Sequence, residues 1–589
     1  MFSISGCVVF SVILLLSVQN SSGYDEYHKS QRNIYRHSMP QNRQEVTSTH
    51  WVNEAQSAIE ARLKYAQPRG RARNVVMFLG DGMSVPTLAA ARTLLGQREN
   101  RTGEESNLFF ETFPTVGLAK TYCVDSQIPD SACTATAYLC GVKANRGTLG
   151  VTAAVPRWDC PASVDTSSHL ESIAAWALAD GRDAGIVTTA RVTHASPAGA
   201  YANVANRDWE NDAQVHADQY DPELCRDIAY QLVHTYPGNQ FKVILGGGRR
   251  EFLPNDVIDE EGSSGRRSDG RHLIEEWQMD KIMRNVSYQY VWNREQLLSV
   301  NNDLPDYLLG LFEASHLQYN MQANNYTEPT LAELTETAIR SLSRNDKGFF
   351  LFVEGGRIDH AHHDNQVELA LDETIELSRA VNRAAELLAE DDSLIVVTSD
   401  HAHVMAFNGY THRGGDILGP SDTTGDDGVP YMTLSYTNGP GYRPYVNNQR
   451  VDITREENYR DLEWRSHAEI PLESETHGGE DVAVFAWGPH NSMFSGMYEQ
   501  NQIPHLMAYA AWLSLKDYIL CERDGAKKNT NGVLSRAARD VSIMRGATYR
   551  TDSSQAHRAP RRAHVACHAS LRAEPLATLR HGHRAHLRL

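Results

Sequence analysis

Short runs of Val, Ile, Leu and Phe recur along this chain, and they lack the polar alternation of a strand that has one face in water. The runs are VVMFLG, GIVTT, KVILGGG, FFLFV, SLIVVTS and VAVFAW. Apolar runs of this kind are typical of strands buried on both faces, as in a parallel sheet. Stretches of helical composition separate them, one of which begins at Val85. We therefore predict an α/β fold in which a central, mostly parallel β-sheet is sandwiched by helices.

Acidic, imidazole and hydroxyl side chains stand close to the ends of these runs. Because residues that follow the carboxyl ends of parallel strands meet at one edge of the sheet, we expect these groups to converge there. So many acidic and imidazole groups would repel one another or stay unpaired unless cations held them together. The pattern thus predicts a multinuclear metal site with a serine nucleophile. The residues are Asp81, Ser131, Glu354, Asp359, His363, Asp400, His401 and His477.

Ser131 follows Asp130 at the head of SACTATAYLCGVK, a stretch whose Ala, Leu and Thr content favours a helix. A helix N-terminus offers free amides and the positive end of the helix dipole, which favour an anion. An isolated Asp-Ser-Ala would more simply be a helix cap. The metal-type residues elsewhere in the chain favour the nucleophile interpretation instead.

Asp359 and His363 are separated by four residues, so on a helix they share one face and can hold the same ion. His360 and His362 would then point elsewhere. The alternative is a solvated polar turn, which the adjoining buried run FFLFV argues against.

Asp400 and His401 form a pair at the end of SLIVVTS that could provide ligands for a second ion, and His403 stands beside them. Asp81 lies in the sequence G-D-G, where the glycines let the backbone turn sharply and let the carboxylate bridge two ions. An Asp-Gly turn after a strand is common, and that interpretation is compatible with a ligand role.

The N-terminal segment MFSISGCVVFSVILLLSVQNSSG has a short apolar centre followed by small polar residues. This pattern predicts a secretory signal peptide over residues 1–23, and no later segment is long and apolar enough to cross a bilayer. A polar arm over residues 24–50 and a helical pattern from Glu54 to Tyr65 follow. Secretion permits disulfides, and it also suits glycosylation sequons on an extracellular surface. The sequon asparagines are Asn100, Asn285 and Asn325.

The length of 589 residues allows one large domain or two, and the net charge of −18 disfavours nucleic acid as a partner. Residues 51–520 would form the main domain, and residues 410–475, rich in Gly, Pro, Asp, Thr and Tyr, are a candidate small insertion. Residues 521–589 form a basic tail, dense in Arg and His from Arg545 on, which we interpret as disordered. A metal-binding tail and an error in the gene model are alternatives, and we favour the error over a function.

Eight cysteines occur, of which Cys7 lies in the signal segment and Cys567 in the tail. None of the others shows a CxxC spacing, so we do not expect a zinc site built from cysteines. The others are Cys123, Cys133, Cys140, Cys160, Cys225 and Cys521.

The chain resembles the animal-type alkaline phosphatases from about residue 50 to residue 520. The motifs that carry the resemblance are NVVMFLGDGMS, PDSACTATAYLCGVKAN, TTARVTHASPAGAYA, ANRDW, GFFLFVEGGRIDHAHH, VVTSDHAHV and ETHGGEDVAVFAWGP. The resemblance implies a secreted or cell-surface homodimer that hydrolyses phosphate monoesters at alkaline pH through a phosphoserine. It also implies that the insertion at 410–475 is a small, irregular, crown-like element.

The resemblance assigns roles to residues of these motifs, with two zinc ions and one magnesium ion as cofactors. Ser131 would be the nucleophile, and Arg207 in ANRDW would clamp the phosphate. The first zinc would be held by Asp359, His363 and His477. The second would be held by Asp81, Ser131, Asp400 and His401, and the magnesium by Asp81, Ser196 and Glu354. The residues that surround these ligands would be Asp130, His194, His360 and His403.

Elementary chemistry agrees with these roles. A serine hydroxyl is a poor nucleophile at neutral pH, and zinc at its oxygen stabilises the alkoxide while the other zinc polarises the leaving oxygen. Histidine with aspartate suits catalytic zinc, whereas oxygen ligands alone suit magnesium. The guanidinium of Arg207 fits two phosphate oxygens better than a lysine would. The alternative for Arg207 is an ordinary surface arginine beside Trp209.

The resemblance further implies a structural calcium site formed by the Phe312 carbonyl, Glu313 and Glu328. Glu328 stands where the family usually has Asp, a change that calcium tolerates. A further acidic ligand would lie between Asp256 and Glu261.

The resemblance matches one family disulfide to Cys160 and Cys225. At another, Trp512 stands where the first cysteine is expected, which leaves Cys521 without that partner. Cys123 and Cys133 are close in sequence and are candidates for pairing instead. The family's hydrophobic C-terminal signal for a lipid (GPI) anchor is not visible, so membrane attachment would need an anchor that this C-terminus does not show.

Two other functions stay open. One is a phosphodiesterase or sulfatase of the same superfamily. Sulfatases need a Cys or Ser within the motif C/S-x-P-x-R, and the sequence S-A-C-T-A around Ser131 does not match it. The magnesium ligands together with Arg207 also favour a monoester substrate. The other is a non-catalytic surface glycoprotein, which predicts lost ligands, and none is lost.

Overall fold

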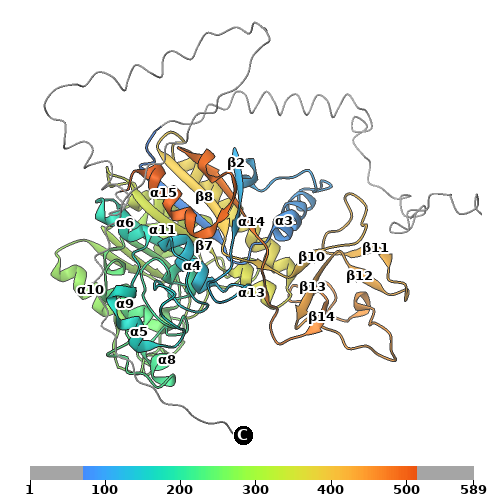
Figure 1. The fold of residues 1–589 in the computed structure, drawn as a ribbon, viewed down its shortest axis with the longest axis horizontal. Helices are drawn as coiled ribbons and strands as arrows, with labels where there is room; N and C mark the ends of the chain where they lie inside the picture. Colours follow the sequence, from blue (N-terminus) through green and yellow to red (C-terminus); the bar gives the residue numbers. More distant parts are fainter. Residues whose placement is uncertain (1–69, 514–589) are drawn as a thin grey trace, which may run out of the picture. The chain divides into compact units, whose positions relative to one another are not determined.

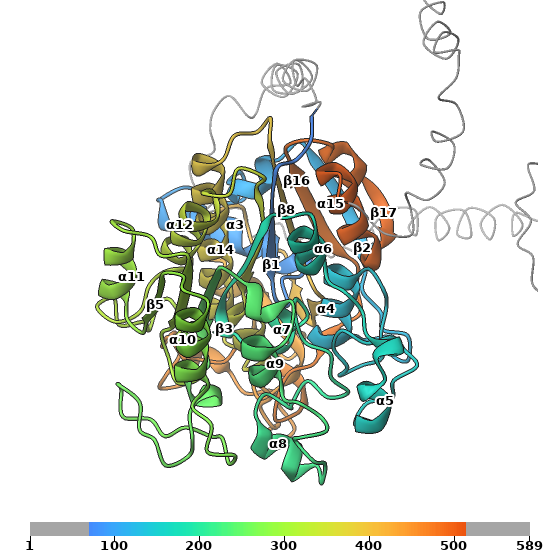
Figure 2. The same ribbon diagram turned by 90° about the vertical axis from the view of Figure 1, so that its left-hand side faces the viewer.

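A ten-stranded β-sheet lies at the centre of residues 70–513, the part of the chain that the computed structural model describes (Figures 1 and 2). Its strand order is β17-β2-β16-β8-β1-β7-β3-β4-β6-β5. From β8 to β5 every neighbouring pair is parallel, whereas β16 runs antiparallel to both of its neighbours. The predicted mostly parallel sheet is therefore confirmed. The strands are β1 (Asn74–Gly80), β2 (Thr115–Lys120), β3 (Asp183–Arg191), β4 (Val243–Gly247), β5 (Tyr288–Val291), β6 (Tyr307–Leu311), β7 (Phe349–Gly355), β8 (Ser393–Ser399), β16 (Val482–Trp487) and β17 (Gly496–Glu499).

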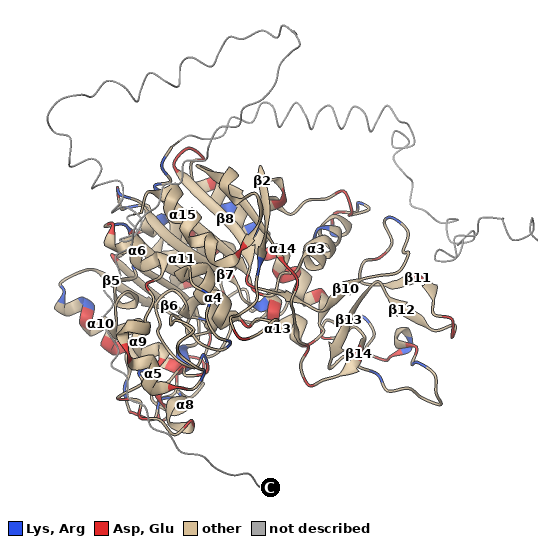
Figure 3. Ribbon diagram, in the orientation of Figure 1, with Lys and Arg blue, Asp and Glu red and all other residues tan. Residues whose placement is uncertain are grey.

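Both faces of the sheet are buried, which is why its strands read as continuous apolar runs. Along β1, Val75 and Met77 pack in one hydrophobic core and Val76 and Phe78 in the other. Figure 3 shows that the strands at the centre of the sheet carry few charged residues, which lie mainly on loops and helices.

Helices cover the two faces and supply the rest of the two cores. One core includes residues of α4 (Ser131–Cys140), α6 (Ile173–Ala179), α9 (Ile228–His234), α10 (Leu273–Met283) and α15 (Ile503–Ala511). The other includes residues of α3 (Val85–Arg98), α11 (Arg294–Val300), α12 (Leu331–Leu342) and α14 (Val367–Leu387). The remaining α-helices of the described residues are α5 (Cys160–Val164), α7 (Ala195–Ala198), α8 (Asp212–Ala217) and α13 (Arg357–His363).

The helices begin where the sequence places capping residues. Ser84 caps α3, which starts at Val85 as predicted, and Thr330 with Glu333 forms a capping box on α12. The helix predicted at Ser131 is α4, which Asp130 caps and which ends before Gly141 at a left-handed φ of 76°.

Residues 410–475, predicted to be an irregular insertion, contain short strands that belong to two small sheets apart from the central one (Figure 1). One sheet joins β10 (Met405–Phe407), β13 (Leu434–Gly439) and β14 (Ala468–Pro471), and the other joins β11 (Pro420–Thr424) and β12 (Pro430–Met432). After β8 the chain leaves the central sheet through β9 (Ala402–His403), and it returns to the sheet at β16 through β15 (His477–Gly478). These two strands pair with each other, which sets His477 opposite His403.

Several predictions fall on residues outside the described part. They concern the signal peptide over 1–23, the arm over 24–50, the helix from Glu54 to Tyr65, the tail over 521–589, and Cys7, Cys521 and Cys567. Within residues 70–513, no helix combines the length and apolarity needed to cross a membrane.

Candidate active site and metal centre

The strand ends bring the predicted ligands to one edge of the sheet. Asp81 and Asp400 directly follow β1 and β8, which are neighbours in the sheet, and Glu354 lies near the end of β7. Helix α13, which follows β7, carries Asp359. Because β16 runs antiparallel, it begins at the edge where the parallel strands end, and this direction brings in His477.

Asp359, His363 and His477 form the first cluster of ligand atoms. The Nε2 atoms of His363 and His477 lie 3.1 Å apart. They lie 3.3 Å and 3.4 Å from the two carboxylate oxygens of Asp359. His363 and His477 keep 29% and 14% of their side chains exposed, whereas Asp359 is buried. One side of this cluster therefore faces solvent.

Asp81, Ser131, Asp400 and His401 form a second, buried cluster. The Nε2 atom of His401 lies 3.2 Å from Ser131 Oγ, 3.0 Å from Asp400 Oδ2 and 3.7 Å from Asp81 Oδ1. The serine hydroxyl at the start of α4 thus reaches the same imidazole as two carboxylates.

A third cluster shares Asp81 with the second and includes Ser196 and Glu354. Ligand atoms of Asp81, His194 and Glu354 lie within 4.8 Å of one another. Thr188 donates a hydrogen bond to Glu354 Oε2, but Glu354 Oε1, Ser196 Oγ and both carboxylate oxygens of Asp81 are buried without a hydrogen-bond partner. Buried polar atoms without partners are costly, so these oxygens fit an ion that prefers oxygen ligands.

The electrostatics of these clusters also fit cations. Burial and the neighbouring carboxylates of Asp400 and Asp359 raise the pKa of Asp81 well above its usual value. Burial also raises the pKa of Glu354 to about 7. For Asp359 burial acts the same way, but the imidazoles of His363 and His403 bring the pKa well below its usual range. Positive charge between Asp81 and Glu354 would let both ionise at neutral pH.

The Arg207 guanidinium lies beside these clusters and is held from two sides. Its Nη1 donates to Asp130 Oδ2 at 3.0 Å, and its Nη2 lies 3.2 Å from His194 Nε2. Asp130 in turn accepts hydrogen bonds from the backbone N–H groups of Cys133 at 3.2 Å and Gly147 at 2.9 Å. Arg207 keeps 18% of its side chain exposed, so its guanidinium can meet a ligand from solvent.

A pocket of about 440 Å³ opens next to the first cluster. A molecule that entered this pocket would meet the solvent-facing imidazoles of the first cluster. Its lining residues are Ser126, Ile128, Pro129, Arg146, His363, Glu475, Thr476 and His477.

Three further histidines of the predicted motifs lie near the clusters or face away from them. His403 Nε2 lies 2.6 Å from Asp359 Oδ1, so this imidazole contacts a ligand of the first cluster. His360 lies instead against His194 and His316, with ring centroids 5.4 Å and 4.2 Å away. The ring nitrogens of His362 contact Thr87 and Tyr436, and its ring packs against that of His403, with centroids 4.9 Å apart.

The residues proposed for calcium lie apart, beyond the end of β6. Gln318 links Glu313 and Glu328, because its Nε2 donates to Glu313 Oε1 at 3.1 Å and its backbone N–H to Glu328 Oε2 at 2.9 Å. Glu328 Oε1 is buried without a hydrogen-bond partner. Burial and the nearby carboxyls of Glu313 and Glu261 raise the pKa of Glu328 to about 8. Phe312 directly precedes Glu313.

The covalent predictions have separate outcomes. The disulfides Cys160–Cys225 and Cys123–Cys133 are both present, so both pairings are confirmed, and Cys140 is a free, buried thiol. The sequon side chains are all exposed, and their glycosylation stays a prediction. They are Asn100, Asn285 and Asn325.

Sequence reasoning missed Glu475 and His316. Glu475 is buried, and its Oε2 lies 2.5 Å from His403 Nδ1, while its backbone carbonyl lies 2.6 Å from His363 Nδ1. The motif ETHGGEDVAVFAWGP contained Glu475, and an acidic residue two positions before a proposed ligand was the available signal. His316 stands in no motif of the sequence, and only the fold brings it to His360 and to Arg191.

Comparisons with known proteins agree on one family. A family model described as alkaline phosphatase matches residues 72–513. The chain is 64% identical over 471 residues to a membrane-bound alkaline phosphatase of Bombyx mori, covering 79% of this chain and 86% of that protein. It is 45% identical over 469 residues to the tissue-nonspecific alkaline phosphatase isozyme of Homo sapiens, covering 78% and 88%.

Solved structures show the same fold at lower identity. The alkaline phosphatase of Thermus thermophilus superposes with a TM-score of 0.53 at 22% identity, covering 76% of this chain and 93% of that one. A mutant alkaline phosphatase of the bacterium TAB5, with Mg bound in its M3 site, gives a TM-score of 0.53 at 19% identity and covers 76% and 99%.

Proposed function

Because the chain belongs to the alkaline phosphatase family and is thus a phosphomonoesterase, we propose that it works through a phosphoserine at Ser131 with two zinc ions and one magnesium ion. The observation that carries this proposal is the convergence of ligand clusters on Asp81 and Ser131, with Arg207 beside them. A binding protein would not need a serine at the start of a helix within reach of a ligand imidazole.

Each metal is proposed from the chemistry of its donors. Asp359, His363 and His477 would hold one zinc on the side that faces the pocket. Asp81, Ser131, Asp400 and His401 would hold the other, and Asp81, Ser196 and Glu354 the magnesium. When bound, the zinc ions would stabilise the serine alkoxide and the leaving oxygen.

The residues of the chain would perform two in-line displacements at phosphorus. Arg207 would hold two phosphoryl oxygens, oriented by Asp130. Ser131 Oγ would form a bond to phosphorus as the ester P–O bond breaks, and the alcohol, carrying the proton that the serine hydroxyl gave up, would leave into the pocket at His363 and His477. Water would then attack phosphorus, the Oγ–P bond would break, one proton of the water would return to Ser131 Oγ, and inorganic phosphate would leave.

We also propose the structural calcium site at the Phe312 carbonyl, Glu313 and Glu328. The further acidic ligand would come from the segment between Asp256 and Glu261. Calcium would offset the charge of carboxylates that burial otherwise disfavours.

Secretion, glycosylation and a homodimeric state are proposals that rest on the family and on features of the chain. The two disulfides agree with an oxidising compartment, and the exposed sequon asparagines are open to modification. A membrane-bound relative raises the question of an anchor, which cleavage by a phospholipase that releases lipid-anchored proteins would answer.

The test of the proposed function is hydrolysis of p-nitrophenyl phosphate at alkaline pH, compared with a phosphodiester and a sulfate ester. We expect strong monoester turnover that is lost on chelation and returns only when zinc and magnesium are both restored. Faster diester or sulfate turnover would favour the other superfamily activities. No turnover with the metals bound would favour the non-catalytic glycoprotein.

A further inference from the structure

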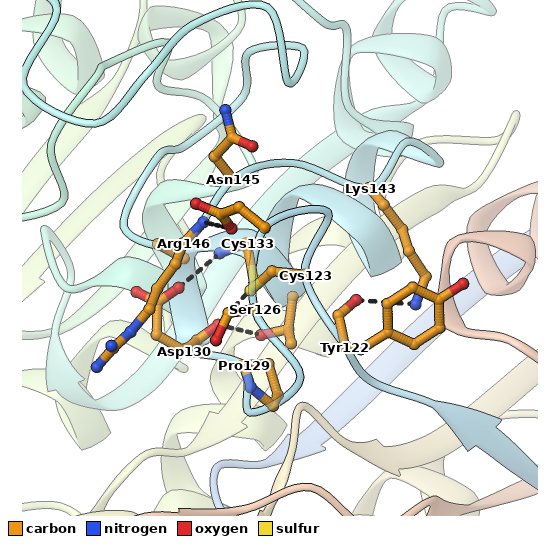
Figure 4. Close-up of a disulfide and its surroundings, with 12 residues drawn as sticks. Tyr122, Cys123, Ser126, Pro129, Asp130, Cys133, Lys143, Asn145 and Arg146 are labelled. Carbon is orange, nitrogen blue, oxygen red and sulfur yellow. Dashed lines mark hydrogen bonds between the residues drawn. A yellow bond between two sulfur atoms is a disulfide. The ribbon is translucent and has the colours of Figure 1, made fainter.

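The Cys123–Cys133 disulfide closes the loop that leads into the nucleophile helix (Figure 4). Cys123 lies before the loop, and Cys133 lies in the first turn of α4, two residues after Ser131. Both cysteines are buried and pack against Ala144. The bond therefore joins the start of an exposed loop directly to the helix turn that presents the nucleophile.

The loop from Cys123 to the start of α4 forms no regular secondary structure and is partly exposed. Between β2 and α4 no strand or helix forms, and Val124 and Ile128 expose 56% and 43% of their surface. Cys123 N–H donates to the Ser126 carbonyl and Val124 N–H to the Ala144 carbonyl, both at 3.0 Å, and Asp125 Oδ1 accepts from the Arg146 N–H at 2.8 Å. A segment of this kind would sample many conformations without a covalent tether.

The last two residues of the loop are nevertheless those that orient the proposed active site. The carbonyl of Pro129 lies 2.8 Å from His477 Nδ1 and so directs the other ring nitrogen toward His363. Asp130 accepts the hydrogen bond that positions Arg207, and it also caps α4. Pro129 further lines the pocket beside His477.

We propose that the Cys123–Cys133 disulfide is a positioning element of the catalytic site, which fixes Pro129 and Asp130 and through them His477 and Arg207. The inference rests on the proposed function. It predicts that opening this bond weakens two separate interactions, phosphate binding at Arg207 and zinc binding at His477. A bond that only stabilises the fold would instead lower the melting temperature alone.

The test removes the bond in the full-length protein with the double substitution C123A/C133A. We expect the dissociation constant for inorganic phosphate, measured by calorimetry on the metal-loaded protein, to rise about tenfold, with KM for p-nitrophenyl phosphate rising in parallel. Zinc affinity of the metal-free protein should fall about tenfold, as when a group that orients a metal ligand is lost. The backbone amide protons of residues 133 and 147 donate to Asp130. In the double variant they should exchange with solvent faster than in the wild-type protein.

Two comparisons separate positioning from stability. C160A/C225A removes the other disulfide and should lower the melting temperature without changing phosphate or zinc binding. Asp130→Asn should weaken phosphate binding but leave zinc affinity unchanged, because Asp130 does not contact His477. If C123A/C133A lowers only the melting temperature, the positioning role is wrong.

The outcome stays decisive when the variant does not fold. In that case, folded wild-type protein is partly reduced with a phosphine, and alkylation with mass spectrometry identifies which bond has opened. Weaker phosphate binding in the fraction open at Cys123–Cys133 supports the proposal, and unchanged binding there overturns it. If the wild-type protein neither binds phosphate nor hydrolyses p-nitrophenyl phosphate, it is the proposed function that fails instead.

Discussion

Glu475 and His403 form a buried contact in which Glu475 Oε2 lies 2.5 Å from His403 Nδ1. The opposite nitrogen of the same ring lies 2.6 Å from Asp359. The Glu475 carbonyl also accepts from His363. Glu475 thus orients His403, which contacts the proposed zinc ligand Asp359. It also orients His363, which is itself a proposed zinc ligand.

Replacing Glu475 with Gln should reduce zinc affinity by roughly 10- to 100-fold, because the amide cannot supply the negative charge that holds His403 toward Asp359. Competition with a zinc chelator measures this directly. Glu473→Gln is the matched control, since Glu473 is exposed in the same segment and should bind zinc normally. Equal zinc affinity in both variants would show that Glu475 does not support the metal ligands.

Replacing Arg207 with Lys should lower kcat/KM for p-nitrophenyl phosphate by about 30-fold or roughly 2 kcal/mol, because one ammonium cannot bind two phosphoryl oxygens in the guanidinium geometry. Phosphate inhibition should weaken with it. Arg226→Lys, at an exposed ion pair with Glu223, should leave both unchanged. Unaltered inhibition by phosphate in Arg207→Lys would contradict the clamp role.

Replacing Ser131 with Ala should lower kcat by at least about 1000-fold, because no oxygen remains to accept the phosphoryl group. Labelled phosphate should bind covalently to the wild-type protein at low pH and not to this variant. Stoichiometric labelling of Ser131→Ala would place the nucleophile elsewhere.

Glu373 provides a test of how stability depends on pH away from the metal clusters. Burial raises its pKa to about 8, although Asn320 N–H donates to its Oε1 at 2.7 Å. A carboxyl with a raised folded-state pKa favours folding while protonated, and this contribution is lost as pH rises from the unfolded pKa toward 8. Glu373→Gln should therefore gain roughly 3 kcal/mol relative to wild type between pH 5 and pH 8.

Urea unfolding at these two pH values measures the difference for Glu373. Glu368→Gln, on the first turn of the same helix, is a control that should show a much smaller pH dependence. A difference between Glu373→Gln and wild type that stays constant with pH would contradict the raised pKa.

The sequence by itself determined the parallel core and the edge at which the site forms. An apolar run such as FFLFV can bury both of its faces only between two packed layers. The polar residues that follow such runs must then meet where the strands end. The spacing of Asp359 and His363 also fixed their common face once α13 formed. Both depend on the hydrophobic periodicity and on the order of residues along the chain, which can be read directly from the sequence.

Only the tertiary structure decided the contacts between distant segments. The antiparallel direction of β16 sets His477 beside His363, and the pairing of β9 with β15 sets Glu475 near His403. The pairing of Cys123 with Cys133 is settled in the same way, from a choice that proximity in sequence left open. Strand direction and side-chain partners follow from how whole layers pack, so no local pattern contains them.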